Sequence, residues 1–374
     1  MEKSNHSSDI ATEFLLLGFS DLRHLRGLLF FVFLVVLLAT LAGNLLIFLA
    51  VAAENSRQPM LFFLCQLSAI ELCYTLVIVP KTLVDLVSPE VSTISFMGCA
   101  TQMHFFATLG GAECFLLAAM AYDRYVAICR PLHYAVMMSQ EFCLQLAVIC
   151  CLGGLIVSLG LTAAVFRLPF CSSRRINHFF CDIPALLHLA CTKSYTSELP
   201  LLAACIIDLL LPFVLILISY SYIAAAVMRI RDSAGRGKAF STCASHLAVT
   251  LLHYGCATFM YVRPKSHYTP NRDKMLSLFY TNITPLLYPL IYSLRNKEIK
   301  GAVKKLLQKK VAQPNWNTVK CNEMVHISEM LFKPHTSKHE HAVDEHSHHI
   351  SQHTENATVA RLRELLIWDP ETED

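Results

Sequence analysis

The sequence predicts an all-α membrane protein whose core is a bundle of seven transmembrane helices. Apolar residues make up 54% of the chain and charged residues only 16%, whereas soluble domains carry about 25% charged residues. The apolar residues gather in seven stretches of roughly twenty residues or more, the length that a helix needs to cross the hydrocarbon core of a bilayer. This pattern excludes an ordinary soluble domain.

The seven predicted spans follow one another with short connections, except between the fourth and the fifth. They run from Leu28 to Ala52, Leu61 to Leu86, Met97 to Ile128, Phe142 to Val165, Leu199 to Met228, Ala239 to Val262 and Met275 to Leu294. An odd number of crossings puts the two ends of the chain on opposite sides of the membrane. The long connection, Arg167 to Ser197, contains three cysteines and is expected to form an ordered lid.

Residues 1–27 are expected to form an extracellular N-terminus. They lack the basic start, short apolar core and cleavage site of a signal peptide, so the first span is expected to act as an uncleaved signal anchor. Asn5 begins an Asn-His-Ser sequon, which fits a glycosylated segment outside the cell. The loop lysines and arginines discriminate poorly between the two orientations.

Four of the 15 cysteines fall in predicted outer segments, where disulfides can form and persist. These four are Cys99, Cys171, Cys181 and Cys191. They suffice for two bridges, and their positions in the sequence do not choose among the three possible pairings. The other cysteines lie mostly in apolar spans, where they are expected to act as small buried hydrophobes.

Beyond residues 28–294, which form the predicted seven-helix domain, the chain changes character twice. Residues 295–310 alternate apolar and lysine positions at helical spacing, which predicts a short helix on an anionic membrane surface rather than a nucleic-acid site. Residues 311–374 are polar and rich in histidine, and predict a disordered cytoplasmic tail. Weak metal binding by these histidines is an alternative role, but no defined metal site is predicted.

Ionisable side chains within the spans are costly in a membrane and therefore indicate function. Glu113 is expected at mid-depth of the third span, where Glu71 and Asn44 from neighbouring spans could meet it. Clustered carboxyl and amide oxygens suit a sodium ion or a shared proton. The alternative is a protonated, hydrogen-bonded cluster with a structural role only.

A second group of polar residues lies about 16 Å further along the third span, eleven residues after Glu113. There Asp123 can hold the guanidinium of Arg124 by charge-assisted hydrogen bonds until a movement releases it. Such a pair is typical of a conformational switch. The alternative is an arginine that reaches the membrane boundary without a partner.

Residues Met120 to Pro131 read MAYDRYVAICRP, which closely resembles the third-helix signature of olfactory receptors, a family of rhodopsin-like receptors. Further segments resemble the same family in the same order: Gly43-Asn44, Pro59-Met60, Leu67-Ser68 with Glu71, His178 to Asp182 (HFFCD), Ser219-Tyr220, Lys238 to Leu247 (KAFSTCASHL) and Pro289 to Asn296 (PLIYSLRN). The resemblance covers about residues 5 to 310, and a set this long is very unusual by chance.

The resemblance implies a receptor that binds a small, mostly apolar volatile molecule and activates a stimulatory heterotrimeric G protein, which raises cyclic AMP. It implies a plasma-membrane protein with its N-terminus outside and its C-terminus in the cytoplasm. The implied partners are an odorant, a G protein of the olfactory stimulatory type, the lipid bilayer and a trafficking chaperone, with no nucleic acid. No cofactor beyond the sodium ion is implied.

Carried over to this sequence, the resemblance also assigns residues. It implies the bridges Cys99 to Cys181 and Cys171 to Cys191. The switch that couples to the G protein would comprise Asp123, Arg124, Tyr125, Tyr220, Lys238, Pro289 and Tyr292. A pocket in the outer half of the bundle would draw on His104, Phe105, Thr108, Ala112, Cys205, Asp208, Tyr254, Thr258, Tyr261, Ser277 and Tyr280. Asp208 is the sharpest of these candidates, because an acid in a cavity could attract an amine or accept a hydrogen bond from an alcohol.

Three positions depart from the family pattern. Tyr288 stands where an asparagine usually precedes the proline of the seventh span, which removes an amide from the polar network. Glu71 stands where rhodopsin-like receptors generally carry Asp, and its longer side chain puts sodium binding in doubt. His253 stands where a phenylalanine is usual.

Two alternatives to an odorant receptor stay open at this point. An ion- or proton-coupled transporter or channel would also bury acids, although transporters tend to show repeated halves, which this sequence lacks. The same kind of receptor could also act as a chemosensor outside olfactory tissue. An enzyme is not expected, because the sequence has no HExxH zinc motif, no phosphate-binding glycine loop and no nucleophile elbow.

Overall fold

The computed structural model describes residues 13–54, 58–88, 92–170, 174–191, 199–230, 232–262, 269–295, 299–301 and 303–305. The sequon at Asn5 and the predicted tail of residues 311–374 therefore lie outside the described residues. Of the predicted surface helix at 295–310, residues 299–301 and 303–305 are described and are helical.

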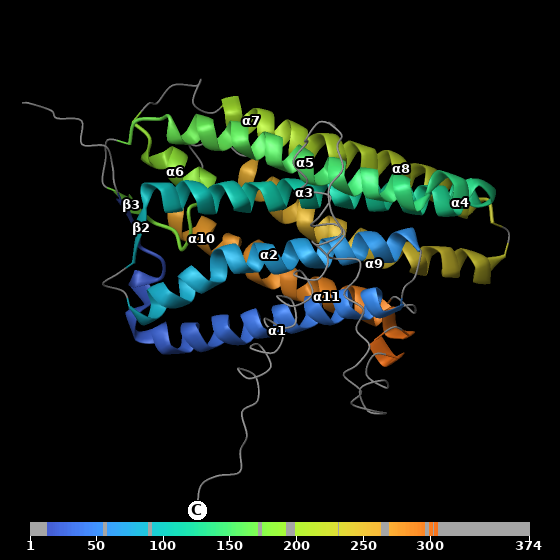
Figure 1. The fold of residues 1–374 in the computed structure, drawn as a ribbon, viewed down its shortest axis with the longest axis horizontal. Coiled ribbons are helices and arrows are strands. Elements are labelled where there is room, and N and C mark those ends of the chain that lie inside the picture. The colour runs from blue at the N-terminus through green and yellow to red at the C-terminus, as the bar shows by residue number, and fades with distance from the viewer. Residues whose placement is uncertain are drawn as a thin grey trace, which may run out of the picture. The chain divides into compact units, whose positions relative to one another are not determined.

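Long helices lie side by side along a common axis (Figure 1). Five of them are continuous: α1 (Arg26–Glu54), α2 (Pro59–Val87), α3 (Phe96–Cys129), α5 (Gln140–Phe166) and α9 (Ser233–Tyr261). Two more consist of an α-helix, a π-helical turn and a second α-helix: α7 (Leu199–Ala204), η5 (Cys205–Leu210) and α8 (Leu211–Met228), then α10 (Pro270–Leu278), η7 (Phe279–Ile283) and α11 (Thr284–Arg295). Each predicted span coincides with one of these helical segments to within a few residues.

Five helical segments within the described residues are long and apolar enough to cross a membrane, namely Ser20–Ala52, Pro59–Val87, Phe96–Cys129, Gln140–Phe166 and Leu199–Met228. Large apolar side chains point away from the protein on these helices, for example Phe31, Leu38, Ile156 and Leu217. In water such surfaces would mark a binding or aggregation site, whereas lipid tails solvate them. The prediction of a mostly helical membrane protein is confirmed to this extent.

Short polar side chains mark where several helices begin. Ser95 accepts a hydrogen bond from the backbone N–H of Gly98 at 3.0 Å, and Ser139 does the same for Phe142 at 3.2 Å. Each bond satisfies one of the N–H groups that have no partner in the first turn of a helix. Proline is the first residue of α2 and of α10, where a backbone N–H would have no partner within the helix, so its absence loses no hydrogen bond.

One end of the bundle, here called the disulfide end, carries structure that the all-α prediction missed. A small sheet with strand order β2-β1-β3 joins β1 (Glu13–Leu16) antiparallel to β2 (Thr93–Ser95) and parallel to β3 (Arg175–Ile176). The short helices η1 (Ser20–Leu25) and α6 (Ile183–Leu189) complete this end. Strands of two to four residues show no alternating pattern that a sequence could reveal.

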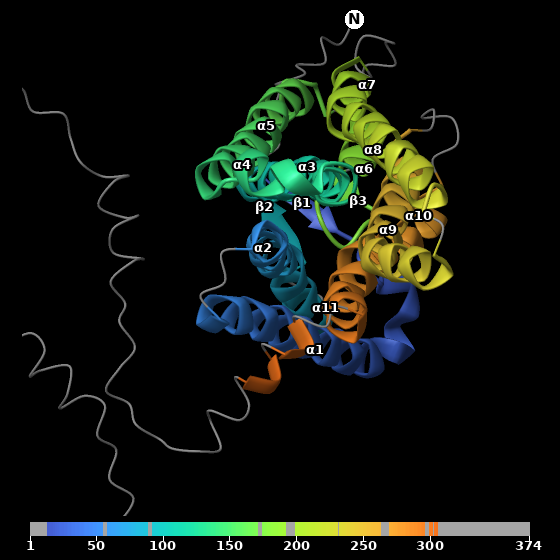
Figure 2. The same ribbon diagram turned by 90° about the vertical axis from the view of Figure 1, so that its right-hand side faces the viewer.

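The opposite end, here called the switch end, carries η3 (Pro131–His133) and α4 (Tyr134–Met137). Viewed along the bundle, α3 lies at its centre, between α2, α5 and α8 (Figure 2). One of the apolar clusters contains side chains from most of the long helices, and α3 is the element that connects the two ends.

Candidate functional site

A cavity with about 700 Å³ of empty space lies between the helices in the half of the bundle nearer the disulfide end. Most of its wall is apolar, and it also carries a few ionisable groups, which is the usual composition of a small-molecule site. Its lining consists of Tyr74, Phe106, Ala107, Gly110, Gly111, Glu113, Cys114, Leu161, Ile183, Leu201, Ala204, Cys205, Asp208, Leu209, His253, Ala257, Tyr261 and Tyr280. Both π-helical turns reach this cavity, in keeping with the frequent occurrence of such turns at functional sites.

Asp208 is the acid in the wall of this cavity that most clearly lacks a partner. It lies on η5, and its Oδ1 atom is buried without a hydrogen-bond partner among the described residues. Its carboxylate faces Gly111 of α3, where an added Cβ atom would lie 3.1 Å from Oδ2. A buried carboxyl oxygen without a partner is costly, and a ligand with a donor group would satisfy it.

The loop before α6 closes the cavity at the disulfide end. The hydroxyl of Tyr261 donates to Asp182 Oδ1 at 3.2 Å and lies 3.0 Å from the hydroxyl of Tyr280. Asp182 also accepts from the backbone N–H of Ile183, where α6 begins. Ile183 then lines the cavity directly. The expectation of an ordered lid is thus met by the described part of this loop.

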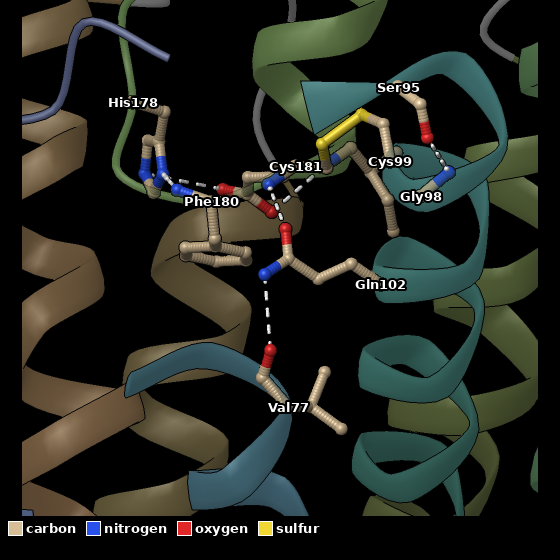
Figure 3. The surroundings of a disulfide bond; sticks show 10 residues. Val77, Ser95, Gly98, Cys99, Gln102, His178, Phe180 and Cys181 are labelled. Atoms are coloured by element: carbon tan, nitrogen blue, oxygen red, sulfur yellow. Dashed lines mark hydrogen bonds and ion pairs between the residues drawn. A yellow bond between two sulfur atoms is a disulfide. The ribbon is translucent and has the colours of Figure 1, made fainter. Parts of the chain in front are cut away.

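A disulfide and hydrogen bonds attach the lid to α3 and α10. The Cys99–Cys181 disulfide joins it to the start of α3, and the backbone N–H of Cys181 donates to Gln102 Oε1 at 3.0 Å (Figure 3). His178 lies 3.0 Å from the hydroxyl of Ser277. Burial lowers the pKa of His178 to about 3, with the nearby Lys274 as the second cause. This histidine is therefore neutral at physiological pH.

The predicted bridge between Cys99 and Cys181 is confirmed. The second predicted bridge stays a prediction, because Cys171 lies outside the described residues, although Cys191 itself is disulfide-bonded.

The structure brings four of the predicted ligand residues together in the cavity wall: Cys205, Asp208, Tyr261 and Tyr280. The other seven positions do not line this cavity, and their contact with a ligand stays a prediction. They are His104, Phe105, Thr108, Ala112, Tyr254, Thr258 and Ser277. For the four of them that lie on α3, the cause is the rotation of this helix, which is apolar nearly all round, so its sequence does not show which face meets the cavity.

The surroundings of three of these seven residues are clear in the structure. His104 faces α5, where its Nδ1 atom lies 2.9 Å from the hydroxyl of Ser158. Phe105 is 49% exposed on the outer surface of the bundle. The hydroxyl of Tyr254 donates to the carbonyl oxygen of Cys114 at 3.0 Å, so this side chain supports the wall from behind.

The floor of the cavity is a polar cluster around Glu113. His253 Nδ1 lies 2.8 Å from Glu113 Oε1, and the hydroxyl of Tyr288 donates to the same oxygen at 2.7 Å. On the other side of the imidazole ring, His253 Nε2 lies 3.2 Å from Cys114 Sγ. Glu71 is 1% exposed, and its Oε2 atom has no hydrogen-bond partner among the described residues.

Asn44 does not complete this cluster in the way that the sequence predicted. Its side-chain amide donates to the carbonyl oxygens of Thr40 at 3.1 Å and Pro285 at 3.2 Å. It therefore ties α1 to the helix that contains Tyr288 instead of donating to Glu71 or Glu113.

At the switch end, Arg124 is buried and forms an ion pair with Asp123, its neighbour in the sequence. The hydroxyl of Tyr134 in α4 donates to the other carboxylate oxygen of Asp123 at 2.8 Å. The predicted pair is therefore present and has a partner on the adjoining short helix. The snorkelling alternative predicted a solvated arginine, which does not match its burial.

The other predicted switch residues surround this pair. Tyr125 of α3 packs on Tyr222 of α8, with ring centroids 5.7 Å apart. Tyr292 is fully buried, and its hydroxyl has no hydrogen-bond partner among the described residues. Pro289 lies against Gly43 of α1, where an added Cβ atom would be 3.0 Å away. The side chain of Lys238 lies outside the described part of the chain.

Tyr220 reveals a contact that the sequence reasoning missed. Its hydroxyl lies 2.7 Å from His246 Nδ1, and His246 Nε2 lies 3.1 Å from the carbonyl oxygen of Leu117. His246 thus joins α8, α9 and α3 in one hydrogen-bonded chain. The segment KAFSTCASHL was recognised in the sequence, but nothing in its spacing indicated that its histidine would reach the centre of the bundle.

A helical membrane bundle with a cavity between its helices near one end and a buried Asp-Arg pair at the other has the architecture of a membrane receptor. A family model described as olfactory receptor matches residues 31–310. Human olfactory receptor 10AC1 is 65% identical over 307 residues, which cover 81% of this chain and 94% of that protein. Human olfactory receptor 10A7 is 49% identical, covering 83% of this chain and 97% of that protein, and mouse olfactory receptor 5AR1 is 47% identical, covering 83% and 99%.

The chain belongs to the olfactory receptor family. It is therefore a multi-pass plasma-membrane protein of the G-protein-coupled receptor class, not an enzyme.

Proposed function

We propose that this chain is an odorant receptor that binds a small, mostly apolar volatile molecule in the cavity and activates a stimulatory heterotrimeric G protein, which raises cyclic AMP. The observation that carries the proposal is the position of α3. This helix supplies the cavity wall from Phe106 to Cys114 and, about 16 Å further along, the buried Arg124. A ligand that shifts α3 or α9 therefore acts on the helices that surround the ion pair.

In the proposed arrangement seven helical segments cross the membrane, with the disulfide end outside the cell and the switch end in the cytoplasm. The α9 segment and the α10–η7–α11 segment are the two additional crossings. Both are long helices that pack against the apolar ones, and their more polar composition reflects the buried residues that they bring to the bundle, such as His246 and His253. The disulfide between Cys99 and Cys181 supports this orientation, because disulfides persist on the extracellular side.

Asp208 is proposed to recognise the polar group of the ligand. The cavity is mostly apolar, and Asp208 Oδ1 in its wall has no hydrogen-bond donor among the described residues. These features fit an amphipathic alcohol or amine with a short hydrocarbon chain. The Asp208→Asn variant is expected to lose response to such ligands about tenfold or more in potency, since hydrogen bonds to a charged group contribute about 1.5–3 kcal/mol.

The test is a measurement of cyclic AMP in cells that carry the surface-labelled receptor, exposed to a diverse odorant panel. A ligand-dependent rise that is lost in Arg124→Ala but kept in Arg229→Ala supports the proposal. Arg229 is the matched control because it is an exposed arginine at the same end of the bundle. No rise with any ligand despite normal surface delivery counts against the proposal, and an ion current in the same cells would favour a channel instead.

We further propose that the polar cluster under the cavity holds a shared proton between His253 and Glu113, in the place where the sequence suggested a sodium ion. The support is the 2.8 Å contact of the imidazole with Glu113 together with the hydroxyl donated by Tyr288. The response is then expected to be the same when sodium in the medium is replaced by choline. The His253→Phe variant, which restores the residue usual in the family, is expected to become sensitive to sodium.

A further inference from the structure

Three side chains at the floor of the cavity are arranged as a nucleophile, a base and an orienting acid. Cys114 Sγ lies 3.2 Å from His253 Nε2, and His253 Nδ1 lies 2.8 Å from Glu113 Oε1. This is the sequence of contacts by which a histidine activates a thiol while a carboxylate fixes the orientation of the ring. All three residues line the cavity.

The arrangement is held from two sides. The hydroxyl of Tyr288 donates to Glu113 Oε1 at 2.7 Å, and the hydroxyl of Tyr254 donates to the carbonyl oxygen of Cys114 at 3.0 Å. The carboxylate of the acid is therefore held by a neighbour on α11, and the backbone of Cys114 by a neighbour on α9, as a preorganised reactive group requires. A metal centre is not the explanation, since no group of three or more His, Cys, Asp or Glu side chains in the described ranges is placed to hold a metal ion.

We propose that Cys114 reversibly captures electrophilic odorants, namely α,β-unsaturated aldehydes and ketones, as covalent adducts in the cavity. This proposal rests on the proposed function of the cavity as the odorant site and names a ligand class for it. The buried, unpartnered oxygen of Asp208 in the same wall is a second indication that the cavity is completed by a ligand.

The reaction is a conjugate addition. The sulfur of Cys114 attacks the β-carbon, a C–S bond forms, and the π electrons of the C=C bond move toward the carbonyl to give an enolate. The thiol proton passes to His253 Nε2 and then to the α-carbon, so the product is a saturated β-thioether carbonyl compound and no oxidant or reductant is needed. Burial of the thiol disfavours a free thiolate, so this proton transfer accompanies the attack.

A second cysteine in the same cavity provides an internal control. Cys205 also lines the wall, but its thiol donates to the carbonyl oxygen of Tyr261 at 3.6 Å, and no histidine among the described residues forms a hydrogen bond with it. The two thiols meet the same ligand in the same cavity. Any difference in their reactivity therefore reports on the contact between Cys114 and His253.

The experiment treats the purified full-length receptor with 2-octenal, using octanal as the saturated control that cannot undergo conjugate addition, then reduces the carbonyl with borohydride and maps cysteine thioether adducts by mass spectrometry. Adducts on Cys114 are expected at least ten times more often than on Cys205, and at least ten times less often on Cys114 in the His253→Phe variant. Equal labelling of the two cysteines in the wild-type receptor would overturn the proposal without any variant. The absence of adducts, or labelling unchanged by His253→Phe, would do the same.

This measurement involves no G protein, so its failure is separate from a failure of the proposed signalling function. In cells, the same chemistry predicts that cyclic AMP signalling by 2-octenal decays more slowly after washout than signalling by octanal. The Cys114→Ala variant is expected to abolish that difference, and a difference that persists in this variant would contradict the proposal.

Discussion

The close contact between α3 and α5 gives the sharpest quantitative prediction for this fold. At Gly154 of α5, an added Cβ atom would lie 2.5 Å from the carbonyl oxygen of Thr108 and 2.6 Å from the backbone nitrogen of Ala112. Both obstacles are backbone atoms of α3, so no side chain can rotate away, and the helices must separate by a sizeable fraction of an ångström. Gly154→Ala is therefore expected to cost about 3 kcal/mol, at the upper end of the range for overpacking.

For a chain of 374 residues, with an unfolding entropy of about 2.1 cal/mol/K per residue, such a loss corresponds to a fall in the melting temperature of about 4 °C. The assay is thermal unfolding of the purified receptor in detergent. The matched control is Gly160→Ala on the same helix, because an added Cβ atom there meets nothing within 4 Å. If Gly154→Ala melts within about 1 °C of Gly160→Ala, the reasoning about the α3–α5 contact is wrong.

Three further predictions concern the polar contacts. Tyr288→Phe removes the hydroxyl that donates to Glu113 and is expected to lower stability by about 1–3 kcal/mol; an unchanged melting temperature would show that this hydrogen bond contributes nothing. Since burial holds the pKa of His178 at about 3 and an unfolded histidine titrates near 6.5, acidification from pH 7 to pH 5 is expected to destabilise the lid by about 2 kcal/mol. Melting curves at both pH values test this, and His178→Gln should lose most of the difference. Replacement of both Cys99 and Cys181 by serine is expected to cost about 2–5 kcal/mol and to reduce surface delivery sharply, as flow cytometry of labelled cells can measure.

The helices were predictable because membrane spans are specified by local composition. A helix that lies in lipid must be apolar over about twenty residues, and this requirement is visible without any knowledge of its neighbours. The sheet at the disulfide end depends instead on contacts between segments as distant as Leu15 and Arg175. No local pattern records such a pairing in strands this short.

The site residues also divide into those that the local sequence specifies and those that contacts between helices determine. Arg124 and Asp123 stood out as adjacent charges at the end of an apolar span, and the resemblance of MAYDRYVAICRP to the family favoured the ion pair that the structure contains. The residues of α3 that line the cavity were not predictable, because His104 and Phe106 are equally plausible candidates until the rotation of the helix is known. The backbone of α3 at Thr108 and Ala112 lies close to Gly154 of α5, so the rotation of α3 depends on its packing against a different helix.

Two of the residues that depart from the family pattern, Tyr288 and His253, contact the same carboxylate in the structure. Taken singly, Tyr288 removes an amide from the seventh span, and His253 puts a polar ring in place of an apolar one. Together they bring a hydroxyl and an imidazole nitrogen to the same oxygen of Glu113, at 2.7 Å and 2.8 Å, and lie 3.3 Å from each other. Both side chains supply partners to the carboxylate of Glu113, which would otherwise be a buried polar group short of partners, a costly state inside a membrane protein. The pair therefore forms one unit, and it is this unit that places a base beside Cys114 at the floor of the ligand cavity.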